Sequence, residues 1–120
     1  MQLISDAGRL TLPADGAGVH WAEHLRVPDL SVGTYSIPAG GTDDQEPHTE
    51  DEIYVIMSGR ATLAGGPAGG DPDGGDTASL AVGPGSVVYV AAGEDHRFTD
   101  ITEDLAALVL FAPAEETRAG

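Results

Sequence analysis

Short apolar runs, broken by glycine and proline at intervals of about ten residues, dominate the hydrophobic pattern of this chain. This rhythm is typical of an all-β sandwich or barrel, and no long stretch shows the three- and four-residue spacing of an amphipathic helix. The pattern predicts strands at residues 10–12, 19–25, 30–37, 53–57, 60–63, 79–82, 87–90, 97–101 and 105–111.

A glycine-rich stretch, residues 64–77, interrupts this rhythm. It has too few apolar side chains to order itself by burial, so it is predicted to be a flexible hairpin tip of variable length. It lacks the Lys-Ser/Thr ending of a phosphate-binding loop, so its glycines do not indicate nucleotide binding. It is not read as a domain linker, because the second half alone would lack the strands that close a barrel. Residues 1–120 are therefore predicted to form a single domain, a length close to the commonest domain size.

The charge of the chain is strongly negative: twenty acidic residues face five arginines and no lysine, for a formal net charge of -15. Binding to nucleic acid requires a basic face, so a nucleic-acid partner is not expected. The acidic residues gather at 43–52, 71–76 and 94–104, near predicted turns, which is typical of a solvated surface. A second interpretation is that an acidic rim favours neutral or cationic ligands over polyanions.

Cysteine is absent, so disulfides, zinc fingers and thiol chemistry are excluded, and any metal ion would be held by nitrogen and oxygen atoms. No apolar run has the length of a membrane span, and the first residues lack the basic start and apolar stretch of a signal peptide. The sequence therefore predicts a cytoplasmic protein with no membrane partner.

Candidate metal ligands lie on both sides of the glycine-rich stretch: Glu46, His48 and Glu52 before it, and His96 after it. Two imidazoles and a carboxylate are the ligand set of an open transition-metal site. On one unbroken strand His48 and Glu52 would lie about 13 Å apart, so the chain must bend between them. The polar residues 49–51 tolerate such a bend, and we expect His48 to end one strand and Glu52 to begin the next.

These segments resemble the two signature motifs of the cupin superfamily, whose members are jelly-roll barrels. The first motif, G-x5-H-x-H-x3,4-E-x6-G, matches residues 40–59, with Glu46 in place of the first histidine. The second, G-x5-P-x-G-x2-H-x3-N, matches residues 85–100, with Ala91 and Asp100 in place of the proline and the asparagine. The resemblance implies an all-β, single-domain cupin jelly-roll β-barrel in which His48, Glu52 and His96 bind one divalent transition metal ion.

The role of Glu46 has two alternatives. If Glu46 binds the ion, the site has two histidines and two carboxylates; if it does not, a facial triad with three open positions remains. Iron in such a site would activate dioxygen, whereas zinc, manganese or nickel would act as a Lewis acid for isomerisation, cyclisation, elimination or decarboxylation. The sequence does not select among these four metals.

Strand alternation predicts which side chains line the pocket. If Glu52 points inward, so do Tyr54 and Ile56, and if His96 points inward, so does Phe98. Tyr54 either fills the barrel or serves as a hydrogen-bond donor or proton carrier for a metal-bound substrate.

Four other residues near these motifs or with similar chemistry are assigned other roles. Glu50 and Asp51 are interpreted as turn residues, with Glu50 as an alternative outer partner of His48. His20 and His24 do not follow the His-Glu-x-x-His order of a zinc protease, and we place both outside the site.

Two functions of different classes fit these observations. The first is a metal-dependent enzyme, a dioxygenase or a non-redox isomerase, cyclase or lyase, that acts on a small organic molecule. The second is a non-catalytic barrel that binds a small ligand. A homodimer is also expected, because barrel-edge strands and an exposed Trp21 suit one and dimers are common in the resembled family.

Overall fold

The computed structural model describes residues 1–14, 18–43, 48–66 and 78–116. Within these ranges the chain forms strands and no helix, and therefore no helix long and apolar enough to cross a membrane. The strands are β1 (His20–Val27), β2 (Leu30–Ile37), β3 (Asp51–Gly66), β4 (Ala78–Val82), β5 (Val87–Val90) and β6 (Asp95–Ala112). The predicted all-β class is confirmed.

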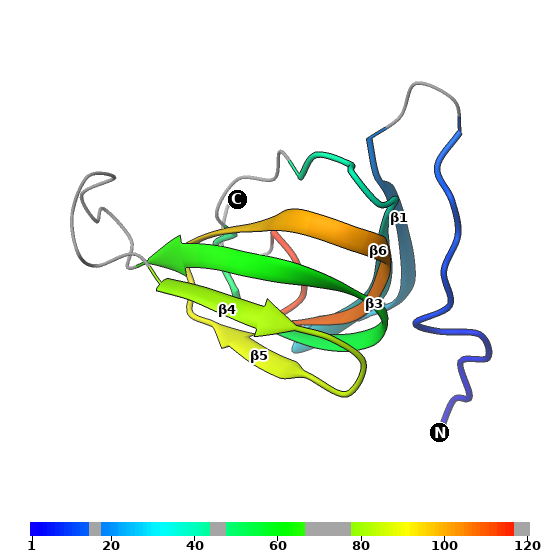
Figure 1. The fold of residues 1–120 in the computed structure, drawn as a ribbon. Helices are drawn as coiled ribbons and strands as arrows, with labels where there is room; N and C mark the ends of the chain where they lie inside the picture. Colours follow the sequence, from blue (N-terminus) through cyan, green and yellow to red (C-terminus); the bar gives the residue numbers. More distant parts are fainter. Residues whose placement is uncertain (15–17, 44–47, 67–77, 117–120) are drawn as a thin grey trace.

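All the paired strands are antiparallel, in the order β1-β2-β6-β3-β4, with β5 paired to β3 beside β4. The long strand β3 is the centre of this arrangement, since it pairs with β4, β5 and β6. Figure 1 shows β3 and β6 curving so that the sheet folds over on itself into a barrel. The interior of that barrel is where inward-facing side chains from distant parts of the sequence meet.

Most predicted strands are confirmed, and those at 30–37 and 87–90 match β2 and β5 at both ends. The predicted turn at Ser58 and Gly59 is wrong, because 53–57 and 60–63 are parts of the single strand β3. Gly59 has a φ of 88°. A Cβ atom there would lie 2.2 Å from the carbonyl oxygen of Asp104. Glycine thus lets β3 bend, with register shifts, against β6 where other residues would clash. Residues 97–101 and 105–111 are likewise parts of β6.

The strand predicted at 10–12 is absent. Instead, the N-terminal segment 1–14 runs along the outside of the barrel (Figure 1). The amide of Gly8 donates to Thr34 Oγ1 at 2.7 Å, and the amide of Thr11 donates to Ser36 Oγ at 3.1 Å. Because these bonds go to side chains of β2 and not to its backbone, the segment covers the outer face of the sheet without joining it.

The predicted hairpin between the two motifs is confirmed by the pairing of Gly65 with Ala78, which makes β3 and β4 antiparallel neighbours. Of the variable stretch 64–77, residues 67–77 lie outside the described residues. This hairpin lies at one end of the barrel, away from β1 (Figure 1).

The core consists of inward-facing apolar side chains, and its largest members are the fully buried rings of Tyr54 and Phe98, 4.9 Å apart in an edge-to-face arrangement. Ile37 and Ile56 are also buried. The alternation predicted from Glu52 and His96 holds for burial at Tyr54, Ile56 and Phe98, and it changes phase further along both strands.

Candidate metal centre

Three predicted ligands come from the beginnings of the two long strands. Glu52 is the second residue of β3, His96 is the second residue of β6, and His48 lies just before β3. His48 lies outside any described strand, and the strand expected to end there falls on residues 44–47, outside the described residues; residues 49–50 form a bend. The carbonyl of His48 accepts a 2.7 Å hydrogen bond from the amide of Gly93, which holds the first motif against the turn of the second.

One ligand atom from each of His48, Glu52 and His96 lies within 4.8 Å of the others. Glu52 and His96 are buried, with relative exposures of 2% and 6%, whereas His48 is partly exposed. Glu46, the fourth predicted ligand, lies outside the described residues. The structure thus brings together three side chains that the sequence separates by up to 48 positions.

The contact between Glu52 and His96 has an unusual geometry. Glu52 Oε1 lies 3.0 Å from His96 Nε2, which is an ion-pair distance, yet the two atoms do not meet hydrogen-bond geometry and neither has a hydrogen-bond partner. His96 Nδ1 lies 2.9 Å from the carbonyl oxygen of Glu94, which can only accept, so Nδ1 carries a proton. In neutral His96, Nε2 is then an acceptor that faces a carboxylate oxygen, and this arrangement requires a cation beside both atoms.

The charge state of His96 reflects the same contact. Burial by itself lowers the pKa of His96, but the adjacent Glu52 carboxylate, helped by the Glu94 carbonyl and by Asp43, raises the pKa above its ordinary value. Either a proton or a metal ion can therefore supply the positive charge between the two side chains.

These donor atoms fit a divalent ion. Nitrogen and oxygen ligands lie about 2.1 Å from such an ion, so two ligands at right angles lie about 3.0 Å apart. The Glu52–His96 distance has this value. The hydrogen bond at His96 Nδ1 also fixes the ring with Nε2 toward Glu52, as outer partners of metal-binding histidines do.

A cavity of about 300 Å³ opens beside these residues, a size suited to a small organic molecule. Its walls combine aromatic and acidic side chains, and it is lined by Trp21, Tyr35, His48, Glu52, Tyr54, Val109, Phe111, Glu115 and Glu116. Of the three side chains expected to line the pocket, Tyr54 does so, whereas Ile56 and Phe98 belong to the buried core below it and are absent from this lining. The cavity therefore borders the hydrophobic core through Tyr54, Val109 and Phe111.

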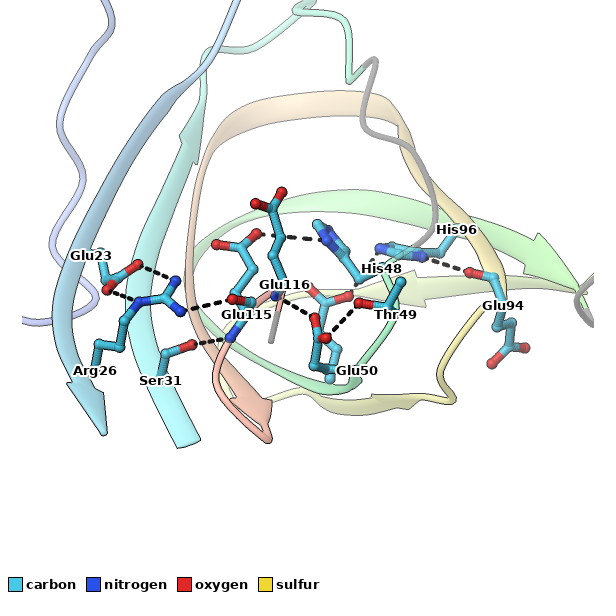
Figure 2. A network of polar contacts seen from close by, with 11 residues as sticks. Glu23, Arg26, Ser31, His48, Thr49, Glu50, Glu94, His96, Glu115 and Glu116 are labelled. Carbon is cyan, nitrogen blue, oxygen red and sulfur yellow. Dashed lines mark hydrogen bonds and ion pairs between the residues drawn. The ribbon is translucent and has the colours of Figure 1, made fainter. Parts of the chain in front are cut away.

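The C-terminal segment after β6 forms part of the cavity wall through Glu115 and Glu116, and no motif or pattern predicted this. Figure 2 shows how it is held: the amide of Glu115 donates to Ser31 Oγ at 2.9 Å, and the carbonyl of Glu115 accepts from Arg26 at 2.8 Å. The amide of Glu116 donates to the Glu50 carboxylate at 2.5 Å. Anchored in this way, the Glu115 carboxylate lies 3.6 Å from His48 Nδ1.

Glu115 is a carboxylic acid in a setting that favours its neutral form. Burial raises the pKa of the Glu115 carboxyl, and the nearby carboxylates of Glu116, Glu23 and Glu52 raise it further, against the lowering effect of Arg26. The cavity thus contains a second acid-base group besides Tyr54, which the sequence did not identify.

Two other acidic residues, interpreted from sequence as part of a solvated rim, are buried. Asp43 has 1% exposure and accepts from the Tyr35 hydroxyl and from the Phe98 amide, each at 2.8 Å. Glu50 also has 1% exposure and accepts from the Thr49 hydroxyl as well as from Glu116, so its reading as a solvated turn residue is wrong. Both carboxylates fix loops that border the candidate centre.

His20 and His24 lie on the outer side of the barrel, where they border a separate cavity of about 410 Å³. His24 Nε2 is 2.6 Å from the Thr34 hydroxyl. Among the described residues these histidines belong to no group of converging metal ligands, in agreement with their assignment from sequence.

Comparison with known proteins places this barrel in a family. No protein-family profile matches the sequence. The uncharacterised protein SCO3923 of Streptomyces coelicolor is 44% identical over 101 residues, which cover 84% of each chain. The structure of TT1209 from Thermus thermophilus is similar with a TM-score of 0.70 and 18% identity, over 92% of this chain and 97% of that one.

Two further solved structures are similar. An RmlC-like cupin family protein with a double-stranded β-helix fold from Methanocaldococcus jannaschii has a TM-score of 0.61 and 16% identity, over 86% of this chain and 87% of that one. Recombinant oxalate oxidase in complex with glycolate has a TM-score of 0.69 and 21% identity, over 92% of this chain and 59% of that one. At such identities the likeness shows the fold alone.

The fold and the arrangement of strands thus define a double-stranded β-helix barrel. The chain belongs to the same family as SCO3923, and its fold is the cupin fold that its two motifs predicted.

Proposed function

We propose that this protein is a single-domain, metal-dependent cupin that acts on a small organic molecule. His48, Glu52 and His96 would hold one divalent transition metal ion, iron, manganese, zinc or nickel, and Glu46 remains a proposed fourth ligand. The observation that carries the proposal is the buried, unpartnered pair of Glu52 Oε1 and His96 Nε2 at 3.0 Å. Two buried acceptors that face each other without a cation lower the stability of the fold. The pair is therefore better explained by a role in binding a metal ion than by a contribution to folding stability.

The bound ion would activate dioxygen if it were iron, or polarise a substrate oxygen if it were one of the other three. The chain itself contributes the surrounding groups. Tyr54 and Glu115 both line the cavity, and each can hold or release a proton near a substrate. The aromatic walls exclude water from one side of the reacting molecule. An enzyme with this fold, oxalate oxidase, supports catalysis as the leading interpretation.

The test is elemental analysis of protein purified without chelators. We expect about one transition metal ion per chain in the wild type, and loss of that ion in His96→Ala. His20→Ala is the matched control, because it removes a histidine from the outer cavity and should leave the metal content unchanged. Absence of metal in the wild type after reconstitution would contradict the proposal and favour a non-catalytic barrel that binds a small ligand.

Turnover distinguishes an enzyme from a binding protein with a structural metal. An enzyme of the proposed kind loses all activity when the ion is removed, whereas a binding module keeps its affinity for the ligand. A screen of small organic acids with the metal-loaded and metal-stripped protein makes this comparison directly.

We also propose a homodimer in the cytoplasm, without a nucleic-acid or membrane partner, as composition predicts. Support for self-association comes from an apolar row on the outer face of β3 and β5, where Ile53, Val87 and Tyr89 are 38%, 65% and 61% exposed. Sedimentation equilibrium tests this, since a Val87→Glu variant should be monomeric if the row forms the interface.

A further inference from the structure

The charge of the cavity wall indicates what kind of molecule enters it. Three carboxylates line the cavity, from Glu52, Glu115 and Glu116, and the described lining residues include no lysine or arginine. Glu52 faces the candidate metal centre, so Glu115 and Glu116 supply the charge on the C-terminal side. Arg26, which contacts this segment, donates to the Glu23 carboxylate and to the Glu115 carbonyl.

The two C-terminal carboxylates are held in place by their backbone. The amide of Glu115 is bound by Ser31, its carbonyl by Arg26, and the amide of Glu116 by the buried Glu50. Figure 2 shows both side chains rising from this anchored segment on the side of His48. The backbone that carries both carboxyl groups is therefore a fixed part of the wall, and it needs little reorganisation when a ligand binds.

Another part of the cavity lining is aromatic. The ring of Trp21 lies edge-to-face with Tyr35 and with Phe111, with centroids 6.3 Å apart in each case. Gly33 makes room for this indole, because a Cβ atom there would lie 2.3 Å from the end of the ring. Trp21 keeps 36% of its surface exposed and lines the cavity.

A cavity lined by both aromatic rings and carboxylates is an environment that attracts organic cations. Ring faces stabilise weakly hydrated ammonium groups by cation–π attraction. A second metal ion is a poorer fit, because hard ions require several oxygen ligands and keep their water. Independently, the buried and unpartnered Glu52 carboxylate lines the same cavity and indicates that a ligand site lies there.

We propose that the cavity binds a small ammonium compound, whose cationic group lies between Trp21 and the Glu115 and Glu116 carboxylates. The same molecule carries an oxygen donor, such as a carboxylate, that reaches the metal centre; this second contact rests on the proposed function. The ligand is thus a zwitterion or an amino alcohol, with its two charged or polar ends recognised by opposite ends of the cavity.

The experiment compares two ligands of one shape. Glycine betaine carries a quaternary nitrogen where tert-butylacetic acid carries an uncharged carbon, and both have the same carboxylate. Trp21 is the only tryptophan in the chain, so its fluorescence reports binding directly. With metal-loaded protein we expect betaine to bind at least about tenfold more tightly.

A double variant, Glu115→Gln with Glu116→Gln, should reduce this preference by about tenfold. The control is Glu103→Gln, which removes one carboxylate charge from an exposed position paired with Arg60. It should leave the preference unchanged. Equal affinity for the two compounds, no detectable binding of betaine, or a preference that survives in the double variant would overturn the proposal.

Failure of the metal site can be separated from failure of the cationic site. Choline and tert-butylethanol form a second matched pair that needs no metal, so they are compared on metal-stripped protein. A preference for choline that the double variant abolishes supports the cationic site even if no metal binds. Equal affinities within both pairs overturn it even if elemental analysis finds one ion per chain.

Discussion

His48 borders the cavity inside the barrel and converges with His96, whereas His20 and His24 border a larger cavity under the N-terminal segment. The two regions offer the same number of imidazoles, and the outer cavity has the greater volume. They differ in what surrounds the rings. Inside, a buried carboxylate meets His96 without a hydrogen bond, while outside His24 is already paired with the Thr34 hydroxyl. A ligand site is identified by unpartnered polar atoms that converge. The number of histidines and the cavity volume do not identify it.

The largest expected effect tests this difference through stability. Metal at about 100-fold above its dissociation constant should stabilise the wild type by about 2.7 kcal/mol. Glu52→Gln should lose this increment, because its side chain no longer offers a charged oxygen to the ion. The measurement is the difference in free energy of unfolding between the loaded and stripped forms of each variant.

His24→Ala is the control for this prediction, since it alters only the outer pair. It should keep the full metal-dependent increment, whatever its own stability. Loss of the increment in His24→Ala, or its retention in Glu52→Gln, would reverse the assignment of the two histidine pairs.

The next effect concerns the support of the inner cavity. Asp43→Ala should lower the free energy of unfolding by about 2 kcal/mol, because the buried Phe98 amide and the Tyr35 hydroxyl lose their acceptor. Asp104→Ala is the matched control: Asp104 accepts from the Ala39 amide at 2.8 Å, but it is exposed. If urea denaturation shows the same loss of unfolding free energy for Asp43→Ala and Asp104→Ala, the burial of Asp43 contributes no extra stability.

A smaller effect belongs to the outer cavity. Thr34→Val keeps the shape of the side chain but removes the hydroxyl that accepts from the Gly8 amide, and it should cost about 1 kcal/mol. Amide hydrogen exchange at Gly8 should become faster, while the metal content stays the same. Thr102→Val, at an exposed hydroxyl near Arg60, is the control and should change neither quantity. A loss of metal in Thr34→Val would show that the two regions are coupled.

The smallest effect is expected at the surface pair of Glu23 and Arg26. The side-chain hydrogen bond from Arg26 lowers the pKa of Glu23, although slight burial opposes it. A lowered pKa in the folded state adds stability above the unfolded value, and that stability is lost as the pH falls through the folded value. Glu23→Gln should therefore be slightly less stable than the wild type at neutral pH and equal to it in strong acid. A difference that grows on acidification would contradict this sign.

Much of the fold could be read from the sequence, because strand alternation and turn residues act locally. β2 and β5 have the predicted ends, and burial follows the predicted period over the first residues of β3 and β6. Local sequence patterns led to wrong predictions where contact with a distant segment of the chain determines the structure. Gly59 looked like a turn residue, yet its role is to let β3 pass close to Asp104 of β6.

The sequence by itself determined the class of the barrel and three candidate ligands, since motif spacing fixes residue types at the starts of β3 and β6. Only the tertiary structure decided which acidic residues are buried. Asp43 is paired with Phe98, 55 positions away, and Glu50 with Glu116, 66 positions away. A carboxylate can leave water only where donors meet it, and folding brings those donors from remote parts of the chain. For the same reason Glu115 and Trp21 became walls of one cavity only when the barrel closed.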